Sequence, residues 1–174
     1  MFYIYNANVV TPTKSIENGA LLTDGDKIKA VGPADSVPCP EGAKKIDAGG
    51  KYLVPGLIEM QLNGGFGNDF TADPETIWTV AGDLAQFGIT TFLPTVITST
   101  IANTAKARKV ITEGKPSGYK GCNPIGLHLE GPFLNPEKKG AHNEDYICTA
   151  KPANIEGWSP DGGVRLVTLA PEMP

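Results

Sequence analysis

From Tyr52 onward, apolar segments alternate with helix-like ones in the order strand, helix, strand, helix, strand. This order is typical of a parallel sheet with crossover helices, because parallel neighbours cannot be joined by a tight turn. The first helix should begin after Asp73, with Pro74 at its first position, and should end at Gly88. The pattern therefore predicts an α/β architecture for this part of the chain.

The spacing of these segments predicts part of a barrel. A second helix should run from about Ile101 to Thr112, and Pro94 should interrupt or end the second strand, because proline cannot donate a ladder hydrogen bond. A (β/α)8 TIM barrel needs eight strands, so we expect residues 54–174 to form only its first three to four βα units, with the chain truncated relative to a whole barrel. The predicted strands cover residues 53–62, 90–98, 125–130 and 165–170.

Residues 1–53 have a different pattern, that of short strands without helices. Candidate strands are Phe2–Tyr5, Ala20–Thr23 and Lys27–Val31, and Asp24-Gly25-Asp26 is a hairpin-type turn between the last two. Prolines interrupt the stretch that follows, and so few strands cannot close a core without others. We expect residues 1–53 to be the amino-terminal strands of a small β-sandwich.

Composition excludes several classes of partner. The 174 residues carry a formal net charge of -4 and a pI near 5.2, so no basic surface is expected for nucleic acid, and a small molecule is the better candidate. No stretch approaches the roughly 20 apolar residues of a membrane span. The three cysteines, Cys39, Cys122 and Cys148, lack paired spacing, which favours free thiols in a reducing compartment and predicts a cytoplasmic location.

The third predicted strand carries polar side chains on one face. Gly126, His128 and Glu130 alternate with two leucines, and Glu130 stands at the carboxyl end, where barrel enzymes keep their chemistry. Glu130 is therefore a candidate functional carboxylate, and the alternative is an exposed side chain at the start of a loop. His128 lies deeper in the strand. It is a candidate for a hydrogen-bonded buried histidine or for a second-shell group that orients a ligand or a water.

Two further segments offer candidate groups. Gln61 and Asn63 share a face with Glu59 at the end of the first strand, and neutral amides can orient a water or a substrate although they are poor zinc ligands. His142, in the segment Lys138–Asn143, could donate a hydrogen bond to a substrate carbonyl while the neighbouring lysines attract an anion. The alternative for this segment is a solvated polar loop.

Several motifs occur together in a characteristic order. The segment Asp47–Glu59 resembles the start of the barrel in the amidohydrolase superfamily. With five further segments it resembles the N-acetylglucosamine-6-phosphate deacetylase family, over nearly the whole chain and over the amino-terminal part, somewhat under half, of a family member. These segments are Gln61–Gly65, Thr91–Thr95, His128–Asn135, Lys139–Asn143 and Thr168–Glu172.

The resemblance implies a role for each candidate residue. Glu130 would be a metal ligand, and Ala141 and His142 would contact the N-acetyl sugar phosphate, with His142 polarising the amide carbonyl. Gln61 and Asn63 stand where other superfamily members carry a His-x-His pair, which implies a single divalent metal ion, zinc in the first place and otherwise iron or manganese. In the family, two further histidine ligands and a catalytic aspartate lie beyond this sequence.

The resemblance also sets the functional expectations. The complete enzyme would convert N-acetylglucosamine 6-phosphate into glucosamine 6-phosphate and acetate, and family members are typically homodimers. We expect the 174-residue chain to lack useful activity by itself, because it supplies one of the three protein ligands typical of a catalytic zinc. The alternatives are another amidohydrolase, acting on a cyclic amide or a similar C–N bond, and a folded fragment without catalysis.

Overall fold

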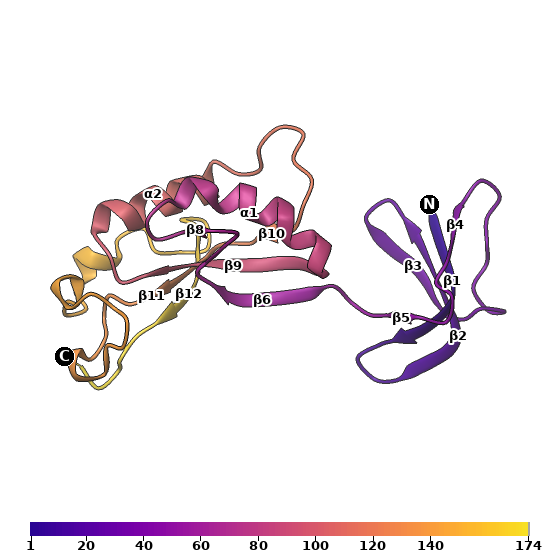
Figure 1. Ribbon diagram of the computed structural model, residues 1–174, viewed down its shortest axis with the longest axis horizontal. Coiled ribbons are helices and arrows are strands. Elements are labelled where there is room, and N and C mark those ends of the chain that lie inside the picture. Colours follow the sequence, from indigo (N-terminus) through magenta and orange to yellow (C-terminus); the bar gives the residue numbers. More distant parts are fainter. Residues whose placement is uncertain (174) are drawn as a thin grey trace. The chain divides into compact units, whose positions relative to one another are not determined.

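The computed structural model describes residues 1–173 of the chain (Figure 1). The chain divides into two compact units, of which the first is Met1–Pro55 and the second begins at Gly56. Each unit has its own cluster of buried apolar side chains. Strands alone build the first unit, whereas strands and helices build the second.

The first unit is a five-stranded mixed sheet in the order β3-β2-β1-β4, with β5 also paired to β1. The hairpin predicted at Asp24-Gly25-Asp26 is confirmed, since Asp24 pairs with Lys27 and Gly25 has a φ of 59°. Strand β4 escaped prediction because it lacks an alternating pattern and forms by pairing in parallel with β1. The strand predicted over residues 53–62 is divided, because Leu53 belongs to β5, which pairs with β1, and only Leu57–Leu62 form β6. The strands are β1 (Phe2–Val10), β2 (Ser15–Asp24), β3 (Lys27–Pro33), β4 (Lys44–Asp47) and β5 (Tyr52–Leu53).

The second unit is a parallel sheet with two helices on one of its faces (Figure 1). Strand β9 lies between β6 and β11, and β12 pairs with β11, all in parallel. The α/β class predicted for this part is therefore confirmed. The elements are β6 (Leu57–Leu62), β7 (Gly64–Gly65), β8 (Asn68–Asp69), α1 (Ile77–Leu84), β9 (Ile89–Ile97), α2 (Ile101–Thr112), β10 (Asn123–Pro124), β11 (Leu127–Glu130) and β12 (Val164–Thr168), with 3-10 turns at Pro74–Thr76, Ala85–Phe87, Pro136–Lys138, Glu144–Tyr146 and Pro152–Ile155.

The helix ends follow the predicted signals with one correction. Helix α2 has the predicted bounds, and Gly88 ends the first helical segment in a left-handed conformation with a φ of 79°. Asp73 precedes the first turn as expected, but its side chain makes no capping hydrogen bond. The turn after it is a 3-10 turn that begins at Pro74, and α1 starts only at Ile77.

Pro94 does not end its strand, because β9 continues to Ile97. The irregularity falls instead on the pairing with β6, whose register shifts between Glu59 and Leu62, next to Pro94. A proline can stay within a parallel strand when the neighbour gives up the ladder hydrogen bond at that point. The expected irregularity is present, whereas an early end of the strand was wrong.

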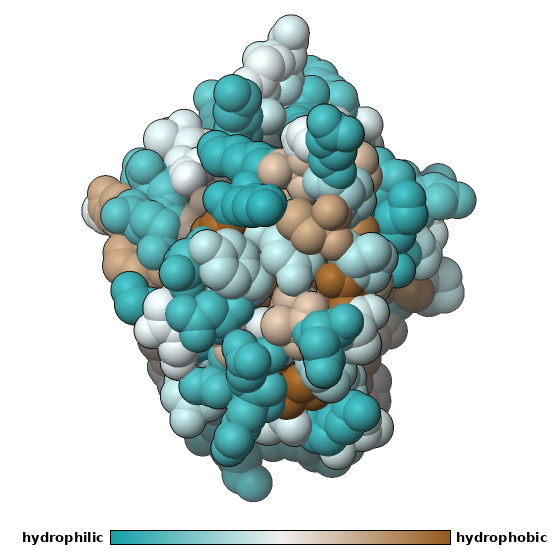
Figure 2. Space-filling view, turned by 90° about the vertical axis from the view of Figure 1, so that its right-hand side faces the viewer, coloured by the Kyte–Doolittle hydropathy of each residue, from teal (hydrophilic) through white to brown (hydrophobic). Residues whose placement is uncertain are grey.

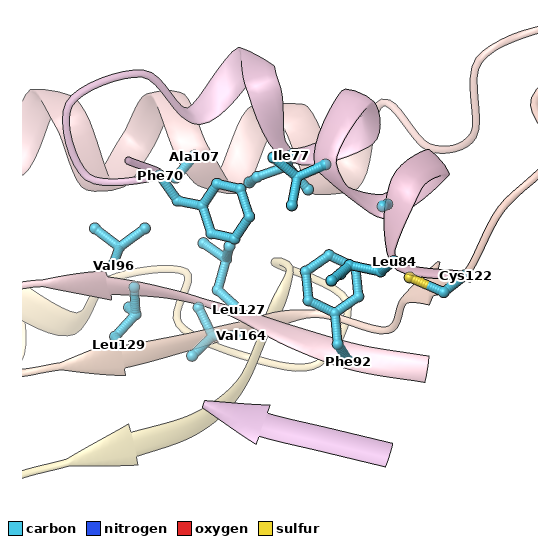
Figure 3. Close-up of a cluster of buried hydrophobic side chains, with 12 residues drawn as sticks. Phe70, Ile77, Leu84, Phe92, Val96, Ala107, Cys122, Leu127, Leu129 and Val164 are labelled. Carbon is cyan, nitrogen blue, oxygen red and sulfur yellow. The ribbon is translucent and has the colours of Figure 1, made fainter. Parts of the chain in front are cut away.

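The core of the second unit lies between the helices and the sheet (Figure 3). The four α1 residues with helical spacing, Ile77, Val80, Ala81 and Leu84, are all buried, as their periodicity predicts. They pack with apolar side chains from the sheet, among them Phe92, which is fully buried. This packing fixes β9 and β11 and therefore the positions of the side chains at their carboxyl ends.

Polar side chains dominate the face of the molecule in Figure 2, and apolar ones gather there only in small groups. Within residues 1–173, no helix combines the length and the apolar character that crossing a membrane requires. The three cysteines are free thiols, as predicted from their spacing.

Candidate functional site

Glu130 is the last residue of β11, and Gln61 reaches it from β6. The side-chain amide of Gln61 donates a hydrogen bond from Nε2 to Oε2 of Glu130 over 3.1 Å. The side chain of Glu59 holds the backbone of Gln61, because its Oε1 accepts a hydrogen bond from the Gln61 N–H over 2.9 Å. Two strands that are not neighbours in the sheet thus place an amide and a carboxylate side by side at their ends.

His142 comes to the same place from the loop after β11. Its Nε2 lies 3.9 Å from Oε1 of Glu130, and the two side chains keep 12% and 22% of their exposure. This separation exceeds a hydrogen bond but lets the carboxylate charge act on the ring. The structure therefore brings Gln61 to Glu130 across 69 positions of sequence and folds the loop after β11 back so that His142 lies beside them.

Thr98 joins the site although the sequence analysis did not single it out. Its Oγ1 lies 2.9 Å from Nδ1 of His142 and 3.3 Å from the backbone carbonyl oxygen of Glu130, and its single hydrogen can be donated to only one of them at a time. Its backbone N–H also points at Nδ1, over 3.4 Å. The only sequence signal was a threonine directly after an apolar strand, which does not by itself indicate a functional role.

An open hollow of about 670 Å³ lies in front of these groups. Glu130 and His142 form part of its wall, and so do Asn63 and Ala141, which the sequence analysis predicted to face a ligand. The two lysines of the same loop contribute positive charge. The complete lining is Asn63, Ile97, Glu130, Leu134, Lys138, Lys139, Gly140, Ala141 and His142.

His128 is 2% exposed and lies beneath this surface. Thr95 from β9 lies 3.2 Å from its Nδ1, and Thr168 from β12 lies 2.7 Å from its Nε2. Burial lowers the pKa of His128, and the nearby Glu130 charge opposes that shift. Because both ring nitrogens contact threonines, His128 fits the prediction of a hydrogen-bonded buried histidine. It can affect the site only indirectly, by linking β11 to β9 and β12.

The side chains around the hollow offer few ligands for a metal ion. Within the described residues, no group of three or more His, Cys, Asp or Glu side chains is arranged to hold a metal ion. Glu130 offers a carboxylate at the hollow, whereas Nδ1 of His142 faces Thr98. Besides Glu130, only Nε2 of His142 lies near enough to act as a ligand, so the described residues of the hollow offer at most two, fewer than the three protein ligands of a typical catalytic zinc site.

Comparison with known proteins gives a consistent relationship. The human N-acetylglucosamine-6-phosphate deacetylase is 39% identical over 135 residues, which cover 73% of this chain and 33% of that protein. The Haemophilus influenzae protein of the same name is 34% identical, over 99% of this chain and 45% of its own length. No family model matches the chain.

The decisive comparison is structural. The crystal structure of N-acetylglucosamine-6-phosphate deacetylase from Pasteurella multocida superposes with a TM-score of 0.83 at 35% identity, over 99% of this chain and 45% of that one. The chain is related to the N-acetylglucosamine-6-phosphate deacetylases. It spans between 33% and 45% of the length of these deacetylases, and the resemblance read from its motifs is thereby confirmed.

Proposed function

We propose that this chain contributes part of the active site of a metal-dependent hydrolase that deacetylates N-acetylglucosamine 6-phosphate. The products would be glucosamine 6-phosphate and acetate. The observation that carries the proposal is that Glu130 and His142 line one hollow, with Gln61 bonded to Glu130, in a chain related to deacetylases of that substrate. The activity belongs to the complete site, which needs residues beyond those described.

The role proposed for His142 is to hold the oxygen of the acetamide carbonyl. Negative charge develops on that oxygen when water attacks, and a fixed N–H donor stabilises it more in the transition state than in the substrate. His142 lines the hollow with its ring held by Thr98, so the donor is already oriented. Ala141 contacts the sugar phosphate beside it, and Lys138 and Lys139 draw the anionic substrate towards the hollow.

Glu130 is the proposed ligand for one divalent metal ion, zinc in the first place and iron or manganese as alternatives. Gln61 holds the carboxylate by donating to one of its oxygens, which leaves the other free. Asn63 lies where it can orient a water or a substrate group. When bound, the metal supplies a Lewis acid and lowers the pKa of a bound water.

We extend the proposal to the architecture. The parallel strands β6, β9, β11 and β12, with α1 and α2 on one face, fit the first βα units of a (β/α)8 barrel. The strands of residues 1–53 fit one part of a β-sandwich. A cytoplasmic enzyme that forms a homodimer, with an amino-sugar phosphate as its small-molecule partner, accords with the family resemblance.

A chimaera tests the function. Residues 1–173 would replace the matching segment of the Haemophilus influenzae relative, and acetate release from N-acetylglucosamine 6-phosphate would be measured with bound metal quantified in parallel. We expect deacetylation by the chimaera and its loss in Glu130→Gln, which keeps the shape but removes the charge. Hydrolysis of cyclic amides without deacetylation would favour the alternative amidohydrolase.

The isolated chain provides the second arm of the test. We expect neither a stoichiometric divalent metal nor acetate release from the purified 174-residue chain, because one carboxylate is too few ligands for tight binding. A stoichiometric metal together with hydrolysis in the isolated chain would contradict the idea that the site is completed from elsewhere.

A further inference from the structure

Thr98 lies between the two side chains on which the proposed function depends. It is 4% exposed, and three of its contacts meet at the site. Its hydroxyl reaches Nδ1 of His142 and the backbone carbonyl of Glu130, and its backbone N–H reaches the same Nδ1. One buried residue thus connects the histidine in the loop to the end of the strand that carries the carboxylate.

The backbone N–H of Thr98 favours one of the two neutral tautomers of His142. An N–H group can only donate, so Nδ1, 3.4 Å away, must present its lone pair. In a neutral imidazole the hydrogen is then on Nε2. The Glu130 carboxylate, with Oε1 3.9 Å from Nε2, favours the same tautomer, because a lone pair on Nε2 would face a negative oxygen.

We infer that Thr98 is a positioning residue that holds His142 in the Nε2–H tautomer. In this tautomer the hydroxyl donates its one hydrogen to Nδ1, the shorter of its two contacts at 2.9 Å against 3.3 Å to the Glu130 carbonyl, and so fixes the angle of the ring. The backbone N–H, which can only donate, disfavours a hydrogen on Nδ1. The value of this tautomer for catalysis rests on the proposed function. With Nδ1 facing Thr98, only an Nε2–H can donate to a carbonyl oxygen of the substrate. The Nδ1–H tautomer would present a lone pair to that oxygen and repel it.

The molecule contains a matched internal control. The chain has two histidines, and each contacts a threonine near the end of β9. Thr95 contacts Nδ1 of His128 as Thr98 contacts Nδ1 of His142. His128 is buried and lies outside the lining of the hollow, so the two pairs differ in access to a ligand while sharing the same chemistry.

Nitrogen NMR of the imidazole rings tests the inference on the chain itself. In a ¹⁵N-labelled sample at alkaline pH, where imidazoles are neutral, long-range proton–nitrogen correlations separate a protonated ring nitrogen from an unprotonated one. Two histidines give two ring patterns, and His142→Gln assigns them. We expect His142 to show a protonated Nε2 and an unprotonated Nδ1. A protonated Nδ1 would overturn the inference without any variant of Thr98.

Substitutions at Thr98 then test the role of its hydroxyl. Thr98→Val keeps the shape and the backbone N–H, and we expect the Nδ1 resonance of His142 to move towards that of a nitrogen without a hydrogen bond. Thr98→Ser should restore the wild-type position. Thr95→Val should move the Nδ1 resonance of His128 and leave His142 in place.

The outcomes separate positioning from stability. If Thr98→Val lowers the melting temperature but leaves the His142 resonances unchanged, Thr98 is only structural and the inference fails. If Thr98→Val does not fold, the wild-type tautomer and Thr98→Ser still decide. The NMR readout requires neither metal nor substrate, so an inactive chimaera would refute the proposed function and leave this result standing.

Discussion

At the scale of single residues, Tyr119 and Cys122 show how burial changes an ionisable group. The Tyr119 hydroxyl donates to the backbone carbonyl of Cys122 over 2.8 Å. Burial raises the pKa of Tyr119 to about 12, and the nearby Cys122 adds to the shift. Burial likewise raises the pKa of the Cys122 thiol. Because both pKa values are raised, the fold favours the protonated, uncharged form of each side chain.

The pKa of Tyr119 gives a pH prediction. Its folded value of about 12 lies above the ordinary 10.0, so its contribution to stability is complete below pH 10 and is lost as the pH rises towards 12. Tyr119→Phe should cost about 1 kcal/mol at neutral pH, through the lost hydrogen bond. It should then lose less stability than wild type on going from about pH 8 to about pH 11.

Urea unfolding at the two pH values measures both effects. The control is Tyr146→Phe, because Tyr146 is 43% exposed. Parallel alkaline losses of stability in wild type and Tyr119→Phe would contradict the prediction, since they would assign the loss to other groups.

At the scale of elements, Arg108 ties helix α2 to the segment before β12. Its Nε donates to the carbonyl of Gly162 over 2.9 Å, and its other two nitrogens donate to Glu156 at 3.2 Å and Gly157 at 2.5 Å. A planar guanidinium can satisfy three carbonyls at once, whereas a lysine ammonium is a point charge. Arg108 therefore orders a loop that has few regular hydrogen bonds.

We predict that Arg108→Met destabilises the chain by about 1–3 kcal/mol, the range for hydrogen bonds to a charged group. Methionine keeps the apolar stem, so the loss reports the guanidinium. Amide hydrogen exchange should speed up in residues 156–163 more than in α2. Lys109→Met is the control, because Lys109 forms only an exposed ion pair with Glu113. Equal exchange in the two variants would argue against the prediction.

Gly131 directly follows the last residue of β11, and its backbone lies against the side chain of Thr98. It has a φ of 89°, and a Cβ at this position would collide with Oγ1 of Thr98. We predict that Gly131→Ala destabilises the chain by more than about 1 kcal/mol, from backbone strain and from the displaced threonine.

Gly140→Ala separates the two causes. Gly140 also has a left-handed φ, of 57°, but a Cβ there would meet nothing within 4 Å, so this variant reports strain alone. Thermal unfolding of the two variants should show the larger loss for Gly131→Ala. Equal losses would mean that the contact with Thr98 has no energetic weight.

At the scale of the whole molecule, β6 leaves apolar side chains in water. Ile58 is 66% exposed and Met60 is 57% exposed, and within residues 1–173 β6 pairs only with β9. Alternating apolar side chains on an edge strand favour association with another chain. We predict concentration-dependent self-association of the purified chain, measurable by light scattering coupled to gel filtration.

The double variant Ile58→Lys, Met60→Lys should shift the chain towards the monomer, because it places charge on that edge. Lys29→Glu, which changes an exposed residue of the other unit, serves as the control. Unchanged association in the double variant would place the contact elsewhere.

The elements that local rules specify were predictable from the sequence. Helix α2, the buried face of α1 and the turn at Asp24-Gly25-Asp26 follow from periodicity, capping and turn chemistry, which involve residues close in sequence. The short strand β4 was missed and β5 was joined to β6, because pairing with β1 gives no local signal. Pro94 marked an irregularity correctly, but only the pairing partner could show that β6 carries it.

The sequence by itself determined the α/β class, the polar face around Glu130 and the motifs that relate the chain to the deacetylases, because these depend on residue type and short spacing. The tertiary structure alone decided that Gln61 bonds to Glu130, that two threonines contact the ring nitrogens of His128, and that Thr98 contacts Nδ1 of His142. Such contacts join residues separated by between 33 and 69 positions. Only the packing of helices on the sheet fixes those distances, and no local preference encodes them.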